Sequence, residues 1–115
     1  MRAINNGDFL YIWNGWSDGK TQFRNESMSG LTFKAMKNAK DPKVRARADF
    51  YLHRTREELY DLRKDPDCLT NLLDKLGDNQ SSRVSAMTKA LWHWMKDVDD
   101  PDLELFQNQV ELALD

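Results

Sequence analysis

The sequence predicts one α+β domain over residues 1–115, with helices packed on a small antiparallel β-sheet and a long amphipathic helix near the C-terminal end. Strand-like segments lie at the start and in the middle of the chain, and helical patterns lie between and after them. Hydrophobic residues make up 40% of the 115 residues and charged residues 31%. This composition suffices for one buried core, and the length excludes two full-sized catalytic domains.

The first predicted element is a β-hairpin. Residues 3–4 and 9–13 flank a polar segment that contains Asn6 and Gly7, and an Asn-Gly pair favours a turn in which both central residues have positive φ. Residues 9–13 are apolar throughout, so both faces of this strand are apolar. We therefore expect the strand to lie at the centre of the sheet, covered on both sides.

A loop and a short helix are expected after the hairpin. Residues 14–30 are rich in Gly, Ser and Thr, which is typical of a long surface loop. Apolar residues at helical spacing predict a helix over Leu31–Lys37, with Ser27 or Ser29 as its N-cap.

A second helix and a further strand are expected next. Asp41 precedes a proline, which is typical of an N-cap and the first helical position, and predicts a helix over residues 43–52. Residues 57–62 alternate in the manner of a strand, and a polar turn at residues 64–67 ends it.

Two helices are predicted toward the C-terminus. The stripe of the long amphipathic helix consists of Val84, Met87, Leu91, Trp94 or Met95, and Val98. Asp100 before a proline then predicts the cap of an acidic terminal helix, whose apolar face continues to the end of the chain.

Charge and cysteine content exclude several classes of function. Seventeen Lys and Arg against 19 Asp and Glu give a net charge of −2, so nucleic acid is not an expected partner. No apolar run approaches the length of a membrane span, and we expect none. Cys68 is the only cysteine, which excludes an internal disulfide and a Cys-x-x-Cys pair.

The side chains that often carry chemistry favour structural roles here. His53 and His93 lack metal-ligand spacing, and the acidic surroundings of Cys68 favour an inert thiol that is buried or half-buried. The carboxylate pairs at residues 57–58 and 99–100 are interpreted as a strand edge and a helix cap.

Aromatic and basic residues are the better candidates for contacts with a ligand. Trp13 and Trp94 lie on apolar stripes and are expected to pack, whereas Trp16 lies in the loop and is the contact candidate. One segment is strongly basic although the chain is not; its cations are Lys34, Lys37, Lys40, Lys43, Arg45 and Arg47. A solvated helical face is the preferred interpretation of this segment, and attraction of sulfated or phosphorylated polyanions is the alternative.

Three segments, in order along the chain, resemble the C-terminal region of the sulfatase family. Residues 1–14 are similar to the hairpin that begins that region, and residues 23–27 resemble a loop of heparan N-sulfatase-like members. The strand and turn that carry the family pattern consist of Glu58, Leu59, Tyr60, Asp61, Leu62, Asp65, Pro66 and, further on, Asn71. Cys68 stands where family members often have Glu, and the tail after Pro101 matches nothing.

The resemblance implies a non-catalytic C-terminal subdomain, docked in cis beside a large α/β catalytic domain of an exported enzyme. Family chemistry needs a Cys or Ser at the start of a Cys/Ser-x-Pro-x-Arg motif, converted to formylglycine, together with Ca²⁺. This chain lacks the motif, so we expect no cofactor in it and no hydrolysis of sulfate esters or sulfamates by the chain alone. In the family pattern Tyr60 and Leu62 are expected to pack, Asp65 to fix a turn and Asn71 to bind backbone groups.

The loop supplies the candidate substrate contacts. Within residues 14–30, Lys20 and Arg24 are expected at the rim of the substrate pocket as partners of a sulfated glycan, with Trp16 as a stacking surface. Packing on a partner domain, or exposure to solvent, is the alternative role for each. The alternative functions for the chain are a free-standing module that binds polyanionic glycans through residues 34–47, and a protein-interaction module with Trp-rich surfaces.

Overall fold

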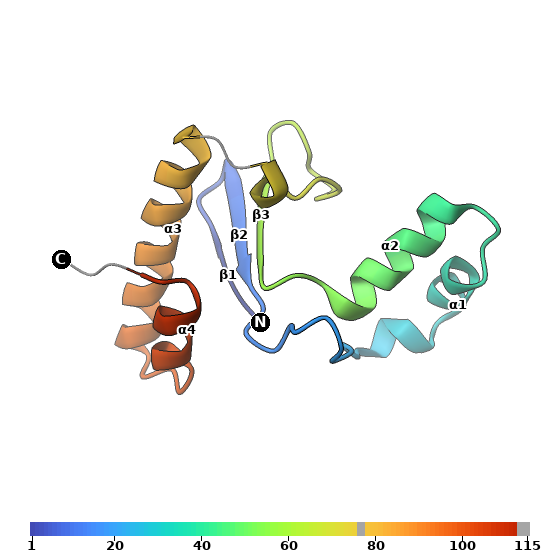
Figure 1. Ribbon diagram of the computed structural model, residues 1–115, viewed down its shortest axis with the longest axis horizontal. Helices are drawn as coiled ribbons and strands as arrows, with labels where there is room; N and C mark the ends of the chain where they lie inside the picture. The colour runs from blue at the N-terminus through green and yellow to red at the C-terminus, as the bar shows by residue number, and fades with distance from the viewer. Residues whose placement is uncertain (76–77, 113–115) are drawn as a thin grey trace. The chain divides into compact units, whose positions relative to one another are not determined.

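The computed structural model, which describes residues 1–75 and 78–112, confirms the α+β class with a small antiparallel sheet (Figure 1). The chain divides into two compact units, Met1–Gly15 with Glu57–Asp115, and Trp16–Arg56. We call them the sheet unit and the inserted unit. The sheet unit contains β1 (Arg2–Asn5), β2 (Phe9–Trp13), β3 (Glu57–Asp61), the 3₁₀ helix η2 (Leu72–Lys75), α3 (Asp78–Asp97) and α4 (Leu103–Gln109). The inserted unit contains the 3₁₀ helix η1 (Glu26–Ser29), α1 (Leu31–Lys37) and α2 (Pro42–His53).

The sheet has three antiparallel strands in the order β1-β2-β3, so the predicted central position of β2 is confirmed. The predicted hairpin is also present, with Asn5 opposite Leu10. Its turn differs from the prediction, because Gly7 has a positive φ of 95° and Asn6 does not. The Asn6 side chain instead accepts a hydrogen bond of 2.8 Å from the backbone N–H of Phe9. The backbone N–H of Asn6 also donates to the backbone oxygen of Phe9 at 3.1 Å, so a backbone and a side-chain hydrogen bond together close the loop.

One face of the sheet packs against α3 and α4, which lie along the same side of it in Figure 1. The buried cluster between them consists of Phe9, Tyr11 and Trp13 from β2, Leu59 from β3, Met87, Leu91 and Met95 from α3, and Phe106 from α4. The three α3 residues are four positions apart, which places them on one helical face. Burial of this apolar face is what stabilises α3 on the sheet.

The predicted stripe of α3 is wrong at Val98, and of its two alternatives Trp94 and Met95 only Met95 belongs to the core, so the expected packing of Trp94 is also wrong. Trp94 is 52% exposed and Val98 is 51% exposed, so neither belongs to the core. The four-residue spacing from Leu91 leads to Met95, which is fully buried, and places Trp94 on the flank of the helix.

The segment after α3 is an integral part of the sheet unit. Phe106 is fully buried, and its ring meets that of Trp13 edge-on at 5.0 Å between centroids. Gln109 accepts a hydrogen bond of 3.0 Å from the Trp13 indole and donates one of 3.2 Å to the backbone oxygen of Gly15. Asp100 was predicted to cap this helix, but α4 begins at Leu103 and Asp102 is its N-cap residue. The Asp100 side chain accepts a hydrogen bond of 2.9 Å from the backbone N–H of Asp102, in the turn before α4, and it also binds the N-terminal strand.

That contact joins the two ends of the sheet unit. The Arg2 guanidinium donates to Asp100 at 2.9 Å and to Asp102 at 3.0 Å. The hydrogen bonds from Arg2 hold the pKa of the Asp100 carboxyl below its usual value of 3.8. The pair therefore ties β1 to the segment between α3 and α4.

A carboxylate is buried on the other face of the strands. Glu58 has no exposed surface, and its carboxylate accepts hydrogen bonds from the Asn14 side chain, at 2.6 Å, and from the Tyr60 hydroxyl. The interpretation of Glu58 as a residue of an exposed strand edge is therefore wrong. Polar partners on neighbouring residues of the sheet unit make this burial tolerable.

The inserted unit contains the loop and the two short helices. The Asp41 side chain caps α2 by accepting a hydrogen bond of 2.8 Å from the backbone N–H of Lys43, as predicted. The predicted cap of α1 by Ser27 or Ser29 is wrong, because Gly30 is the N-cap residue and no side chain caps the helix. Ser29 donates instead to the backbone oxygen of Glu26, within η1. Across the described residues, no helix is both long and apolar enough to cross a membrane.

Candidate functional site

The three residues expected at a substrate rim all lie in the loop of the inserted unit. Trp16 stacks on Phe23, with ring centroids 5.6 Å apart and planes inclined by 20°. Lys20 is exposed beside a tight turn, in which Asp18 accepts hydrogen bonds from the backbone N–H groups of Lys20 and Thr21. Arg24 is exposed one residue after Phe23. Trp16 thus packs on an aromatic neighbour, whereas the two cations face solvent.

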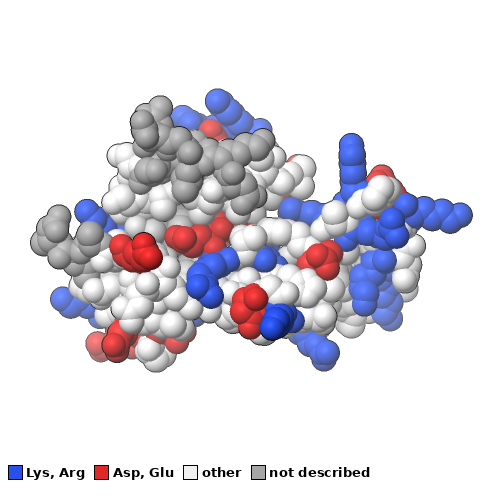
Figure 2. Space-filling model, viewed as in Figure 1, with Lys and Arg blue, Asp and Glu red and all other residues white. Residues whose placement is uncertain are grey.

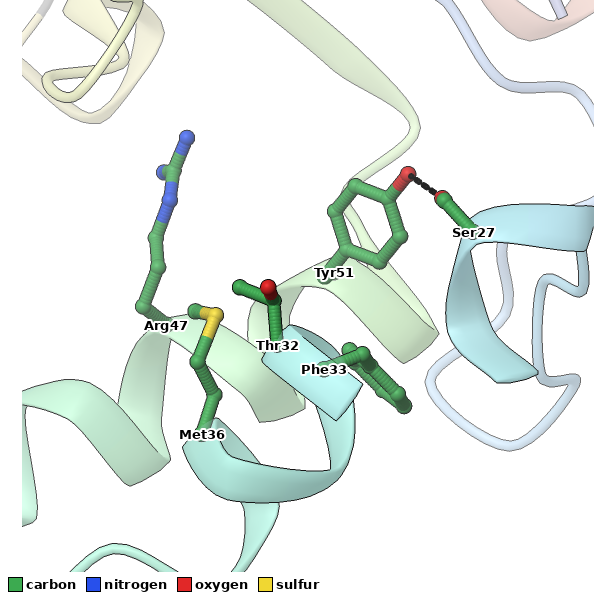
Figure 3. Close-up of a pocket in the computed structure, with 6 residues that line it drawn as sticks. All are labelled: Ser27, Thr32, Phe33, Met36, Arg47 and Tyr51. Carbon is green, nitrogen blue, oxygen red and sulfur yellow. Dashed lines mark hydrogen bonds between the residues drawn. The ribbon is translucent and has the colours of Figure 1, made fainter. Parts of the chain in front are cut away.

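The inserted unit also has a mainly apolar cavity of about 250 Å³, shown in Figure 3. It is lined by Ser27, Thr32, Phe33, Met36, Arg47 and Tyr51. These residues come from η1, α1 and α2. Two aromatic rings, a thioether, hydroxyl groups and one guanidinium therefore surround a space large enough for part of a small organic ligand.

Hydrogen bonds order one wall of the cavity. The Tyr51 phenol accepts a hydrogen bond of 2.8 Å from the Asn25 side chain, and its oxygen lies 3.3 Å from the hydroxyl of Ser27. The hydrogen bond with Ser27 is the main cause that lowers the pKa of Tyr51. The Tyr51 ring is also in contact with Phe33, at 5.9 Å between centroids. This wall is suited to holding a ligand in place, because its side chains are already ordered.

Basic side chains gather on the inserted unit, where Figure 2 shows Lys and Arg in blue over the region of α1 and α2. The exposed cations are Lys34, Lys37, Lys40, Lys43 and Arg45. Arg47 is half-buried and lies over the Phe50 ring at 5.3 Å, while it also lines the cavity. Of the cations in the basic segment, only Arg47 lines the cavity among the described residues, and both features lie on α1 and α2.

The residues of the sulfatase-like pattern lie in the sheet unit. The Asp65 carboxylate accepts hydrogen bonds of 3.0 and 2.9 Å from the backbone N–H groups of Leu69 and Thr70, so the predicted turn at Asp65 is confirmed. Asn71 accepts from the backbone N–H of Leu59 at 3.0 Å and donates to the backbone oxygen of Glu57 at 3.2 Å. It also accepts from the backbone N–H of Leu73, where η2 begins, as predicted.

The remaining members of the pattern are packed in or beside the sheet. Tyr60 is buried and Leu62 is half-buried, two positions apart on one face. Asp61 accepts hydrogen bonds from the side chain and backbone of Arg63. Pro66 is exposed within the turn. These placements are those of structural residues.

The single thiol and the imidazoles are not brought together. Cys68 is half-buried with a positive φ of 54°. His53 lies in α2 with its Nδ1 3.1 Å from the backbone oxygen of Asp49, and His93 lies edge-on to Trp92 in α3. In the parts of the chain that the structure describes, no three His, Cys, Asp or Glu side chains are placed to hold a metal ion.

The cavity was not predicted from the sequence, although Arg47 belongs to the predicted basic segment. The signal was weak: Phe33 and Met36 are three positions apart on a short helix, and such a pair is usually part of a core. The opposite wall comes from Tyr51, on the helix predicted over residues 43–52, for which no ligand contact was expected.

Comparison with known proteins gives no family assignment. No family model matches the chain, and no curated protein matches it.

Proposed function

We propose that this chain is the non-catalytic C-terminal part of a sulfatase, related to the heparan N-sulfatase-like branch and acting on sulfated glycans. One observation supports this most. Two of the three segments that carry the resemblance are far apart in the sequence, yet residues 1–14 and 57–61 contribute to one sheet, and Asn71 binds the edge of that sheet. Segments that resemble the sulfatase family thus build the same sheet, as expected if the resemblance reflects a shared fold.

The catalytic groups of such an enzyme lie on its catalytic domain, in cis. The residues of this chain do not fit formylglycine, because no Cys or Ser begins a Cys/Ser-x-Pro-x-Arg motif. Among the described residues, no three His, Cys, Asp or Glu side chains are placed together as metal ligands. The role of the chain is therefore to complete the fold and to carry the inserted unit.

The inserted unit contributes to the rim of the substrate pocket. Lys20 and Arg24 are exposed cations, which suit hydrogen bonds to the sulfate groups of a glycan. Trp16 presents an aromatic surface already held by Phe23, on which a sugar ring can stack. Together these side chains bind substrate without reacting with it.

The reading frame upstream of Met1 tests this proposal. We expect it to continue for several hundred codons and to include the Cys/Ser-x-Pro-x-Arg motif. An isolated gene that starts at Met1, with no separately encoded catalytic polypeptide, would refute it.

The rim role is tested in the enzyme that contains the chain. Replacing Lys20 and Arg24 by Gln should raise KM for a sulfated oligosaccharide by about three- to tenfold, with kcat unchanged, because the lost contacts act in binding. The double variant Lys89→Gln/Lys96→Gln, in α3, removes the same charge and is the matched control, which should leave KM unchanged. An unchanged KM in the Lys20/Arg24 variant would remove the rim role and leave the sulfatase assignment standing.

A free-standing module that binds polyanionic glycans is the second candidate. The gathering of exposed cations on α1 and α2 favours it (Figure 2). It predicts that the isolated chain is retained on a heparin column and elutes only at high salt. Replacing Lys34, Lys37 and Lys43 by Gln should then lower the eluting salt concentration more than Lys89→Gln and Lys96→Gln do. Elution of the unmodified chain at low salt would discard this candidate.

A further inference from the structure

A polar hollow of about 590 Å³ lies in the sheet unit, apart from the inserted unit and its cavity. Its lining comes from β2, from β3 and the turn that follows it, and from α3. The lining residues are Phe9, Asp61, Arg63, Lys64, Ser82, Arg83 and Ala86. We call this feature the arginine hollow. Its volume lies within the range of roughly 300–1,000 Å³ that is common for small-molecule sites.

Two guanidinium groups of the hollow are held on one aromatic ring. The central guanidinium carbon of Arg83 lies 3.8 Å from the centroid of the Phe9 ring, and that of Arg63 lies 5.0 Å from it. Phe9 is only 4% exposed, so its ring is a fixed support. Cation–π contact orders the two long side chains before any ligand arrives, which reduces the entropy lost on binding.

Positive charge predominates in the hollow. Among the residues that the structure describes there, three cations, Arg63, Lys64 and Arg83, and one carboxylate, Asp61, line it. Asp61 accepts hydrogen bonds from the Arg63 side chain at 3.2 and 3.3 Å, and Arg63 holds the pKa of this carboxyl below its usual value. Asp61 therefore stays ionised and orients one guanidinium, but it does not balance the charge of the lining.

The chemistry of the lining selects the ligand. Guanidinium groups bind oxyanions through paired N–H donors, and an ammonium adds a point charge. The hollow is much larger than a bare sulfate or phosphate ion, and Ser82 contributes a hydroxyl at its wall. An oxyanion attached to a polar body fits it better than an isolated ion.

We propose that the arginine hollow binds a tetrahedral oxyanion ester, a sulfate or phosphate group carried on a sugar. Arg83 and Arg63 hold the oxyanion, Lys64 adds charge at the opening, and Ser82 faces the sugar. The site is separate from the proposed substrate rim, and the inference does not depend on the sulfatase assignment. A purely structural role is the competing account, in which the arginines only cover Phe9.

The test is a titration of the full chain, followed by amide chemical shifts in ¹H–¹⁵N NMR spectra. The probes are glucose 6-sulfate, glucose 6-phosphate and, as the uncharged control, glucose. We expect saturable shifts around Phe9 and Arg83 with one or both esters and none with glucose. Comparison of the two esters decides between sulfate and phosphate as the preferred group.

Variants distinguish a role of the arginines in ester binding from a role in covering the Phe9 ring. Arg83→Gln should weaken ester binding about tenfold or more, because a charge-assisted contact is lost. Arg45→Gln, on α2, makes the same change of charge outside the hollow and should have no effect. Lys64→Gln leaves both cation–π contacts in place and should weaken binding about threefold even if Arg83→Gln unfolds the chain.

Two results would overturn the proposal. One is the absence of saturable shifts at Phe9 and Arg83 with both esters. The other is an unchanged affinity for the ester in the Arg83→Gln and Lys64→Gln variants when both are folded. The arginines would then only cover the Phe9 ring. Neither result bears on the reading frame upstream of Met1, so failure of this inference and failure of the sulfatase assignment are distinguishable.

Discussion

Replacement of Phe106 by Ala tests whether α4 is integral to the sheet unit. Phe106 has no exposed surface and meets the Trp13 ring at 5.0 Å. Removing a fully buried Phe side chain costs about 3–5 kcal/mol, including the cavity that is left and the aromatic pair that is lost. In a unit of this size each kcal/mol lowers Tm by roughly 4–8 °C, so we expect a decrease of at least about 12 °C.

Urea unfolding followed by tryptophan fluorescence is a suitable assay. Trp13 is buried, and its indole donates a hydrogen bond to Gln109, which lies in α4 as Phe106 does. Leu105→Ala is the matched control: Leu105 lies in α4, is 44% exposed and should cost less than about 1 kcal/mol. Phe106→Leu keeps most of the volume and should cost less than about 1.5 kcal/mol, so a result is obtained even if the Ala variant does not fold. Equal stability of Phe106→Ala and Leu105→Ala would refute the packing of α4.

Three further predictions concern the sheet unit. Glu58→Leu removes a buried acceptor of two hydrogen bonds and should lower the free energy of unfolding by about 2–4 kcal/mol in urea titrations, with Glu58→Gln less affected. The Arg2–Asp100 pair should stabilise the chain above about pH 4 and lose this effect as the pH falls and Asp100 takes up a proton, so Arg2→Gln should flatten the acid limb of the Tm–pH curve. Gly15→Ala places a Cβ 2.5 Å from the Trp13 ring and should cost about 1–3 kcal/mol by thermal unfolding.

Each of these predictions has a result that contradicts it. Equal stability of Glu58→Leu and the unmodified chain would mean that the carboxylate is not buried among polar partners. The sign of the pH effect follows from the lowered pKa of Asp100, since a carboxyl of depressed pKa binds its proton less readily in the folded state. Parallel acid limbs for the unmodified chain and Arg2→Gln would therefore exclude the ion pair. A fully stable Gly15→Ala variant would mean that the Trp13 ring lies elsewhere.

Local patterns in the sequence predicted most of the secondary structure. Continuous apolar character identified β2 as the central strand, and Asp41 before a proline located the start of α2. Each of these patterns consists of a few consecutive residues, so it can be recognised without knowledge of the tertiary structure. The roles of Asp65 and Asn71 were predictable for a similar reason, since their bonds join residues close along the chain or in one adjoining strand.

Features that depend on distant residues could not be predicted. A glutamate in a strand is usually exposed, and one of the partners that make the burial of Glu58 understandable, the Asn14 side chain, lies 44 positions away. The docking of α4 depends in the same way on Trp13, 96 positions from Gln109. The arginine hollow joins Arg63 to Arg83 through Phe9, from a third element, so no sequence motif marks it.

The length and the sulfatase activity of the native polypeptide that contains these residues test the central proposal most directly. An antibody raised against the 115-residue chain can isolate that polypeptide from its source, and the captured material can then be assayed with an aryl sulfate in the presence of Ca²⁺. We predict a polypeptide much longer than 115 residues that carries sulfatase activity, while the isolated chain has none. Capture of the 115-residue chain alone, without a catalytic partner and without turnover above the blank, would contradict the proposal.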